Sequence, residues 1–276
     1  MNRNFFKLLE ARHEKGLRVC VGLDLAIDKI PSHLRERNAD YDAIAQFGME
    51  IIDATHEFAC AFKPNAAFFE AIPTVGSAVL QSLISHINKV APDVPVIFDS
   101  KRGDIGNTND GYVKSAFDIF GADAITLSPY MGRESLESFL KQKDKGCFIL
   151  CRTSNPGAGE FQNLRLEDGD FLYLYERVAS NVAKEWNTDS NCALVVGATA
   201  PKELASVRRI IGPDMTILIP GIGAQGGDIE RTVKAGGEKI IVNLSRSVLY
   251  ASDGEDFAKA ARLEVERVNA EIHKWL

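Results

Sequence analysis

The chain has 276 residues, of which 45% are hydrophobic and 25% are charged, so it can bury a large core within one α/β domain. Its net charge of −6 gives no excess of lysine and arginine for a polyanion, and we expect no nucleic-acid partner. No stretch approaches the roughly 18 apolar residues of a membrane span, and the N-terminus lacks the apolar core of a signal peptide. These features predict a soluble, cytoplasmic protein without a membrane segment.

The first predicted element is a docked helix within residues 1–16, where Phe5, Leu8 and Leu9 recur at roughly helical spacing. Eight short apolar or β-branched runs follow, at residues 19–24, 59–63, 96–100, 124–128, 147–152, 192–196, 216–220 and 239–243. Segments of helical periodicity lie between them, at residues 41–56, 77–90, 111–120, 171–186 and 201–211. Such alternation favours a parallel sheet, and eight repeats favour a closed barrel. The sequence predicts a single (β/α)8 TIM barrel of the α/β class over residues 1–276, with an extra N-terminal helix.

The cysteines are odd in number and lie in short apolar runs that resemble buried strands: Cys20, Cys60, Cys147, Cys151 and Cys192. Cys147 and Cys151 would be about 13 Å apart along one strand, beyond the roughly 7 Å limit for a disulfide. We predict reduced core thiols rather than disulfides or metal ligands.

Three predicted strands end in charged residues, at Asp24, at Lys63 and at Asp99 with Lys101. Positions two apart share a face of a strand, so Asp99 and Lys101 should point the same way. Asp104 follows after Gly103, which allows a sharp turn. An isolated D-x-K-x-x-D is more often a surface salt bridge with a helix N-cap. Here five charges gather where barrels place their chemistry, which predicts a catalytic site.

The longest irregular stretch, from Thr153 to about Asp170, follows the fifth predicted strand and is long enough to indicate a lid or binding loop. It should lie on the catalytic face of the barrel. The pair Pro156 and Gly157 favours a type II turn that would hold Ser154 over the barrel mouth. A loop serine taken alone is usually only solvated.

Residues 221–226 follow the seventh predicted strand and match the pattern G-x-G-x-x-G. A Rossmann fold would need this motif in its first βαβ unit, with an acid at the end of the next strand, whereas that end here carries Asn243 and Arg246. Barrels instead bind phosphate between the loops after strands seven and eight, and Arg246 could add a bidentate contact. The glycines alone would also fit a tight turn that only permits close helix packing.

Together these segments resemble the orotidine 5'-phosphate decarboxylase family, in particular its branch with a longer loop after strand five. The matching segments are residues 21–24, 62–65, 98–108, 153–157, 220–228 and 243–246, which span nearly the whole chain. One departure is Gly106, where the commoner family pattern often has proline, so the following helix could start differently.

The resemblance implies an enzyme that needs neither metal nor cofactor and that decarboxylates orotidine 5'-phosphate to uridine 5'-monophosphate (UMP) in pyrimidine synthesis. It implies that Lys101 protonates C6 of the pyrimidine after carbon dioxide leaves. Asp99, Asp104 and Lys63 would complete an alternating charged array. Because decarboxylation leaves a vinyl carbanion that no carbonyl delocalises, a fixed ammonium beside C6 is the available stabiliser.

The resemblance also implies how the substrate is bound. Asp24 and Lys63 would hold the ribose hydroxyls, and Ser154 would bond the pyrimidine. Gln225 and Arg246 would grip the 5'-phosphate.

The same resemblance implies a homodimer with shared active sites. Asp104 and Thr108 would reach across the interface into the neighbouring subunit's site.

Two other functions remain compatible with the motifs. One is a metal-dependent sugar-phosphate decarboxylase or lyase on a related barrel, because some of these share D-x-K-x-x-D. Lys63 between acidic partners favours the metal-free reaction, since its ammonium already supplies the positive charge. The other is a catalytically silent phosphate-binding scaffold, against which the intact set of Asp99, Lys101 and Asp104 argues.

Overall fold

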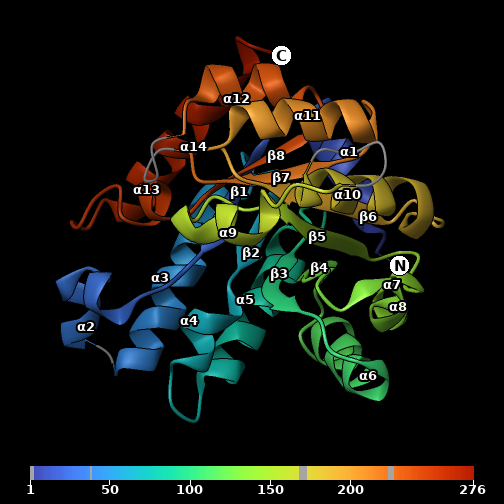
Figure 1. Cartoon of the computed structure of the whole chain (residues 1–276). Coiled ribbons are helices and arrows are strands. Elements are labelled where there is room, and N and C mark those ends of the chain that lie inside the picture. The colour runs from blue at the N-terminus through green and yellow to red at the C-terminus, as the bar shows by residue number, and fades with distance from the viewer. Residues whose placement is uncertain (1–2, 38, 168–172, 223–226) are drawn as a thin grey trace.

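The computed structural model describes residues 3–37, 39–167, 173–222 and 227–276. Its parallel strands are β1 Val19–Leu23, β2 Ala61–Pro64, β3 Ile97–Arg102, β4 Ala124–Leu127, β5 Gly146–Arg152, β6 Cys192–Val196, β7 Ile217–Pro220 and β8 Ile240–Leu244. They form one sheet in the order β2-β1-β8-β7-β6-β5-β4-β3. Isolated parallel bridges, Phe62 to Val96 and Asn65 to Asp99, join β2 to β3 and close the ring. The predicted barrel is confirmed (Figure 1).

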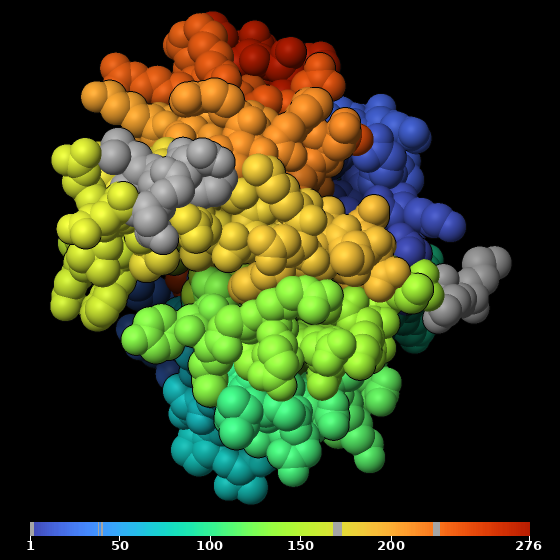
Figure 2. All heavy atoms as spheres, turned by 45° about the vertical axis from the view of Figure 1, so that its right-hand side comes forward, coloured from blue at the N-terminus to red at the C-terminus, as the bar shows by residue number. Residues whose placement is uncertain are grey.

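Helices cover the outside of the barrel, and successive segments of the chain lie as neighbouring bands on the face in Figure 2. The longer ones are α3 Asp40–Thr55, α5 Gly76–Val90, α6 Gly106–Val113, α10 Leu174–Asn181, α11 Pro201–Ile211, α12 Ile229–Gly236 and α14 Phe257–His273. The shorter ones are α2 Ser32–Arg37, α4 Ala66–Glu70, α7 Gly132–Ser135, α8 Glu137–Leu140, α9 Gly159–Gln162 and α13 Arg246–Leu249. Two predicted helices continue as π-helical turns, after α6 at Lys114–Ile119 and after α10 at Val182–Trp186. None of the helices in the described part of the chain is long and apolar enough to cross a membrane.

The barrel interior is closed at its N-terminal end by helix α1, Phe5–Glu14. Phe5 is fully buried, and its ring meets that of Phe148 edge to face with centroids 5.3 Å apart. Leu9 packs into the same inner cluster of apolar side chains. A Cβ at Gly146 would lie 2.7 Å from the Phe5 ring, so the start of β5 must lack a side chain there. The predicted N-terminal helix therefore acts as the plug of the barrel.

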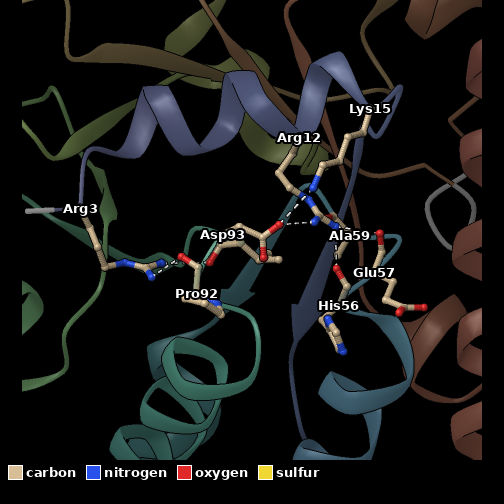
Figure 3. A network of polar contacts seen from close by, with 9 residues as sticks. Arg3, Arg12, Lys15, His56, Glu57, Ala59, Pro92 and Asp93 are labelled. Atoms are coloured by element: carbon tan, nitrogen blue, oxygen red, sulfur yellow. Dashed lines mark hydrogen bonds and ion pairs between the residues drawn. The ribbon is translucent and has the colours of Figure 1, made fainter. Parts of the chain in front are cut away.

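A buried arginine fixes this plug to the barrel (Figure 3). Arg12 is 3% exposed and donates to the main-chain carbonyls of His56, Glu57 and Ala59 at 2.6, 2.8 and 2.9 Å. Its remaining terminal nitrogen pairs with Asp93 at 2.9 Å. The charge is thus matched, and each of the three carbonyls at this end of the barrel receives a donor.

A second arginine, Arg3, holds the start of α1. It donates through two nitrogens to the carboxylate of Asp123, each at 2.8 Å, and the Asp123 side chain is fully buried. Asp123 also accepts from the main-chain N–H of Val96 at 2.9 Å. These bonds attach the N-terminal segment to the loops that lead into β3 and β4.

The five cysteines are free and buried, as the sequence predicts. Cys20 and Cys60 lie in the cluster inside the barrel, whereas Cys147, Cys151 and Cys192 face the layer between strands and helices. Burial raises the pKa of Cys60 and of Cys192 to about 12. These thiols are therefore neutral and unreactive in the folded protein.

Candidate active site

A pocket of about 530 Å³ opens at the C-terminal ends of the strands. Six residues predicted for the site line it: Asp24, Lys63, Asp99, Lys101, Ser154 and Arg246. The other polar residues around it are Thr126, Thr153, Asn155, Gln162, Asn243, Ser245 and Ser247. Asp104 and Thr108 are not part of this lining, and Gln225 lies outside the described residues.

One carboxylate is clamped between two ammonium groups on one wall of the pocket. Asp99 binds Lys63 through Oδ2 at 2.7 Å and Lys101 through Oδ1 at 2.6 Å. Burial would raise the pKa of Asp99, but the charges of Lys63 and Lys101 outweigh it and hold that pKa well below its usual range. Burial would likewise lower the pKa of Lys63, but the charges of Asp99 and Asp24 raise it instead. Asp99 and Lys63 therefore both stay charged at neutral pH.

Strand β3 is irregular where it carries this pair. Its register with β4 shifts between Phe98 and Arg102, and Lys101 has a φ of +47°, which residues other than glycine rarely adopt. The predicted convergence of Asp99 and Lys101 is present, but a bulge rather than regular alternation produces it. Lys101 ends with its side chain half exposed to the pocket.

A threonine that the sequence did not single out joins this group. Thr126 on β4 donates through its hydroxyl to Asp99 Oδ1 at 2.9 Å. The same hydroxyl accepts the main-chain N–H of Lys101 at 2.9 Å. No pattern in the sequence indicated this role, because a threonine in an apolar run is an ordinary strand residue.

Two buried oxygens in the pocket lack a partner within the described part of the chain. They are Oδ1 of Asp24, just after β1, and Oδ1 of Asn243, near the end of β8. A Cβ at Gly22 would lie 2.1 Å from Ser245 Oγ and 3.3 Å from Asn243 Oδ1, so only glycine leaves room for these side chains. Unpaired buried acceptors are costly, and here both can bond hydroxyl groups of a ligand. Asn243 was not among the predicted site residues, although a polar residue ending an apolar strand could have indicated it.

Arg246 lines the pocket just after β8, at the first position of α13, and β1 separates β8 from the strand of Lys63. Its side chain is exposed, and Ser245 and Ser247 flank it on the pocket wall. The pocket thus joins a charged wall at β2 and β3 to a guanidinium and two hydroxyls after β8. A phosphorylated ligand of nucleotide size fits both the chemistry and the volume.

Residues 17–261 match the family described as "Orotidine 5'-phosphate decarboxylase / HUMPS family". The chain belongs to this family. An orotidine 5'-phosphate decarboxylase of Herpetosiphon aurantiacus is 51% identical over 244 residues, which cover 88% of each chain. The solved OMP decarboxylase of Leishmania donovani is 40% identical with a TM-score of 0.81, over 97% of this chain and 99% of that one. The UMP synthase of the same organism is 41% identical with a TM-score of 0.84, and this chain spans 56% of its length.

The loop after β5, a feature of the branch of the decarboxylase family that the sequence resembles, contains helical turns that the sequence did not predict. It contains a 3-10 turn at Pro156–Ala158 and helix α9 directly after it. The predicted type II turn is wrong, because Gly157 does not have the positive φ that this turn requires. Pro156 instead occupies the first helical position, for which its fixed φ is suited.

Ser154 lines the pocket although the predicted turn is absent, because contacts with α9 and with the end of β6 hold it there. The main-chain N–H of Thr153 donates to Gln162 Oε1 at 2.8 Å, and Gln162 returns a bond to the Thr153 hydroxyl at 2.9 Å. A Cβ at Gly197 would lie 2.6 to 2.8 Å from atoms of Ser154, so the loop packs closely on β6. Gln162, which the sequence reasoning missed, therefore ties α9 back to the end of β5.

Asp104 and Thr108 lie away from the pocket of their own chain. The Asp104 carboxylate accepts the N–H of Ile105 at 2.7 Å, and Thr108 is exposed on α6. Helix α6 begins at Gly106 with a φ of +39°, a conformation closed to the proline common at this point in the family. Ile105, next to Asp104 in the chain, is 57% exposed, and Tyr130, in the turn after β4, is 87% exposed.

Proposed function

We propose that Lys101 donates the proton to C6 of the pyrimidine as orotidine 5'-phosphate loses carbon dioxide. The reaction itself follows from the family and from 51% identity to an orotidine 5'-phosphate decarboxylase, so the chain is a carboxy-lyase of pyrimidine nucleotide synthesis. One observation carries the residue assignment. Asp99 is clamped between Lys63 and Lys101, which keeps a charged ammonium fixed in the pocket.

The array suits the electronic demand of this reaction. When the bond from C6 to the carboxylate breaks, its electron pair stays on C6, in an orbital that the ring does not delocalise. The Lys101 ammonium supplies positive charge and then the proton that forms the C6–H bond, and the resulting amine recovers a proton from solvent. Leu150, Val195 and Leu218 line the same pocket, and their apolar surface strengthens these electrostatic interactions.

The remaining pocket residues account for the rest of the substrate. Asp24 and Asn243 offer unpaired acceptors to ribose hydroxyls, and Ser154 bonds the pyrimidine. Arg246 binds the 5'-phosphate, together with Gln225.

An assay without added metal separates this mechanism from a metal-dependent sugar-phosphate lyase. The loss of orotidine absorbance on mixing protein with orotidine 5'-phosphate should proceed at the same rate with and without a chelator. Both oxygens of Asp99 are bound by lysines, which supports this expectation. Inhibition by the chelator, reversed by one divalent metal, would refute the metal-free mechanism.

We further propose a homodimer in which Asp104 and Thr108 complete the neighbouring subunit's site. Neither residue lines the pocket of its own chain, which supports this arrangement. The exposed side chains of Ile105, next to Asp104, and of Tyr130 and Met131 after β4 also support it, because exposed apolar surface commonly marks an interface.

Mixing two inactive variants tests the shared site. Lys101→Ala and Asp104→Ala homodimers should each be nearly inactive. A mixed dimer has one site with both lesions and one site with neither, so with free exchange activity should recover to roughly a quarter of wild type. Exchange is verified separately with mass-tagged chains. Confirmed exchange without recovery would contradict the shared site.

We also propose a cytoplasmic location, which the state of the cysteines supports. All five are free and buried, which suits a reducing compartment. Fractionation of the source cells, followed by the decarboxylase assay, tests this assignment.

A further inference from the structure

The backbone around Lys101 departs from a regular strand in a specific way. Phe98 pairs with Ile125 and Arg102 pairs with Leu127. Three residues of β3, from Asp99 to Lys101, therefore lie opposite the single residue Thr126 of β4. The regular hydrogen bonds between two parallel strands cannot pair all main-chain groups of these three residues. Lys101 in addition has a left-handed backbone conformation.

The Thr126 hydroxyl supplies the bonds that the ladder lacks here. It accepts the main-chain N–H of Lys101 and donates its own hydrogen to Asp99 Oδ1, both at 2.9 Å. The same Asp99 oxygen accepts the Lys101 ammonium at 2.6 Å. A closed ring thus runs from the Lys101 main chain through Thr126 and Asp99 back to the Lys101 side chain.

Only a group that both donates and accepts can occupy this place in the ring. A hydroxyl does so, whereas an ammonium only donates and a carboxylate only accepts. Thr126 is 2% exposed, so water has little access to replace it. An apolar side chain of the same shape would leave the Lys101 N–H unpaired and would remove one donor from Asp99.

We infer that Thr126 is a positioning residue of the decarboxylase: its hydroxyl fixes the left-handed backbone of Lys101 and the orientation of Asp99. The Lys101 ammonium is thereby held at one place in the pocket before the substrate arrives. This inference rests on the proposed role of Lys101. Thr126 acts through that lysine rather than on the reacting carbon, so its loss should affect turnover more than binding.

Three variants test the hydroxyl in two matched comparisons, wild type with Thr126→Val and Thr126→Ser with Thr126→Ala. Thr126→Val keeps the shape and loses the hydroxyl, and kcat should fall on the order of 100-fold while KM changes less than about 3-fold. Thr126→Ser should stay within about 5-fold of the wild-type kcat, because the hydroxyl remains. Thr126→Ala also lacks the methyl group, so the ratio of kcat between Ser and Ala isolates the hydroxyl even if the valine variant does not fold.

Thr232→Val is the control for loss of a buried threonine hydroxyl. Thr232 is fully buried on α12, and its hydroxyl has no partner among the residues described, so kcat and KM should stay unchanged. A wild-type kcat for both Thr126→Val and Thr126→Ala would overturn the inference. Equal losses in the serine and alanine variants, or a raised KM with unchanged kcat, would also overturn it. Lys101→Ala belongs in the same series: if it turned over normally the proposed mechanism would fail, whereas an inactive Lys101→Ala beside a normal Thr126→Val would refute this inference alone.

Discussion

The two ends of the barrel differ in how they satisfy their polar groups. At the N-terminal end, Phe5 fills the interior, and Arg12 gives a donor to each of three main-chain carbonyls, although both ring nitrogens of His13 are buried there without a partner among the described residues. At the C-terminal end, Asp24 and Asn243 bury oxygens without a partner in the described chain, and Lys101 holds a left-handed backbone. Unsatisfied and strained groups reduce stability, and they are tolerated where a ligand can use them. Changes at the C-terminal end should therefore reduce the catalytic rate with little loss of stability. Changes at the N-terminal end should reduce stability with little loss of catalytic rate.

The largest effect is expected from Lys101→Ala. Removing the proposed proton donor and its positive charge should lower kcat by on the order of 10⁴-fold or more. Thermal unfolding should shift little, because Asp99 keeps Lys63 as a buried partner and the Lys101 ammonium that is lost is half exposed. The absorbance assay and a thermal melt measure the two quantities. A variant with near-normal turnover would show that Lys101 is not the proton donor.

The next effect in size is expected at Arg246, on the β8 side of the pocket. Arg246→Ala should lower kcat/KM for orotidine 5'-phosphate by about 10² to 10³-fold, because the proposed role of the guanidinium is to bind the phosphate. Turnover of orotidine, which lacks the phosphate, should hardly change. Equal losses with both substrates would remove Arg246 from the phosphate site.

At the bottom of the barrel, Arg12→Met should reduce stability and leave kcat unchanged. Three carbonyls and Asp93 lose their buried partner, which should cost about 3 kcal/mol and lower the melting temperature by about 5 to 10 °C. Lys15→Met is the matched control, because Lys15 pairs with the same Asp93 from an exposed position and should contribute less than about 1 kcal/mol. Similar losses in the two variants would contradict the assigned importance of burial.

The smallest effect concerns pH and His13, which lies in the plug. Burial, followed by the charges of Arg18 and Lys239, lowers the pKa of His13 to about 3 from an ordinary value of 6.5. Between these values the unfolded chain binds a proton that the folded chain does not, so stability falls as pH decreases through this window. Between pH 7 and pH 5, the free energy of unfolding should fall by about 2 kcal/mol less for His13→Leu than for wild type, as measured by urea unfolding. Parallel losses in the two proteins would show that His13 is protonated in the fold.

The strands could be predicted to within one or two residues because each is a short apolar run between polar segments. Asp24, Lys63, Asp99 and Lys101 could be predicted for the same reason, since strand ends converge at one rim of a barrel. The hydrogen bonds of Thr126 could not be predicted, because they depend on a bulge that the residue pattern does not indicate.

Turn geometry and burial set the other limits of the sequence reasoning. Pro156 and Gly157 fit both a type II turn and a helical start, and contacts made by the rest of the loop decide between them. Asn243 ends a strand like many solvated residues, and only its burial reveals an unpaired oxygen.

The five buried thiols can report which part of the fold opens to solvent. None of them lines the substrate pocket, and they are divided between the inside of the barrel and the layer beneath the helices. An alkylating reagent should find no target in the closed fold, and each modified cysteine would mark a moment when its layer was exposed to solvent. Mass spectrometry of slowly labelled enzyme would then show whether the interior and the outer layer separate together or one before the other.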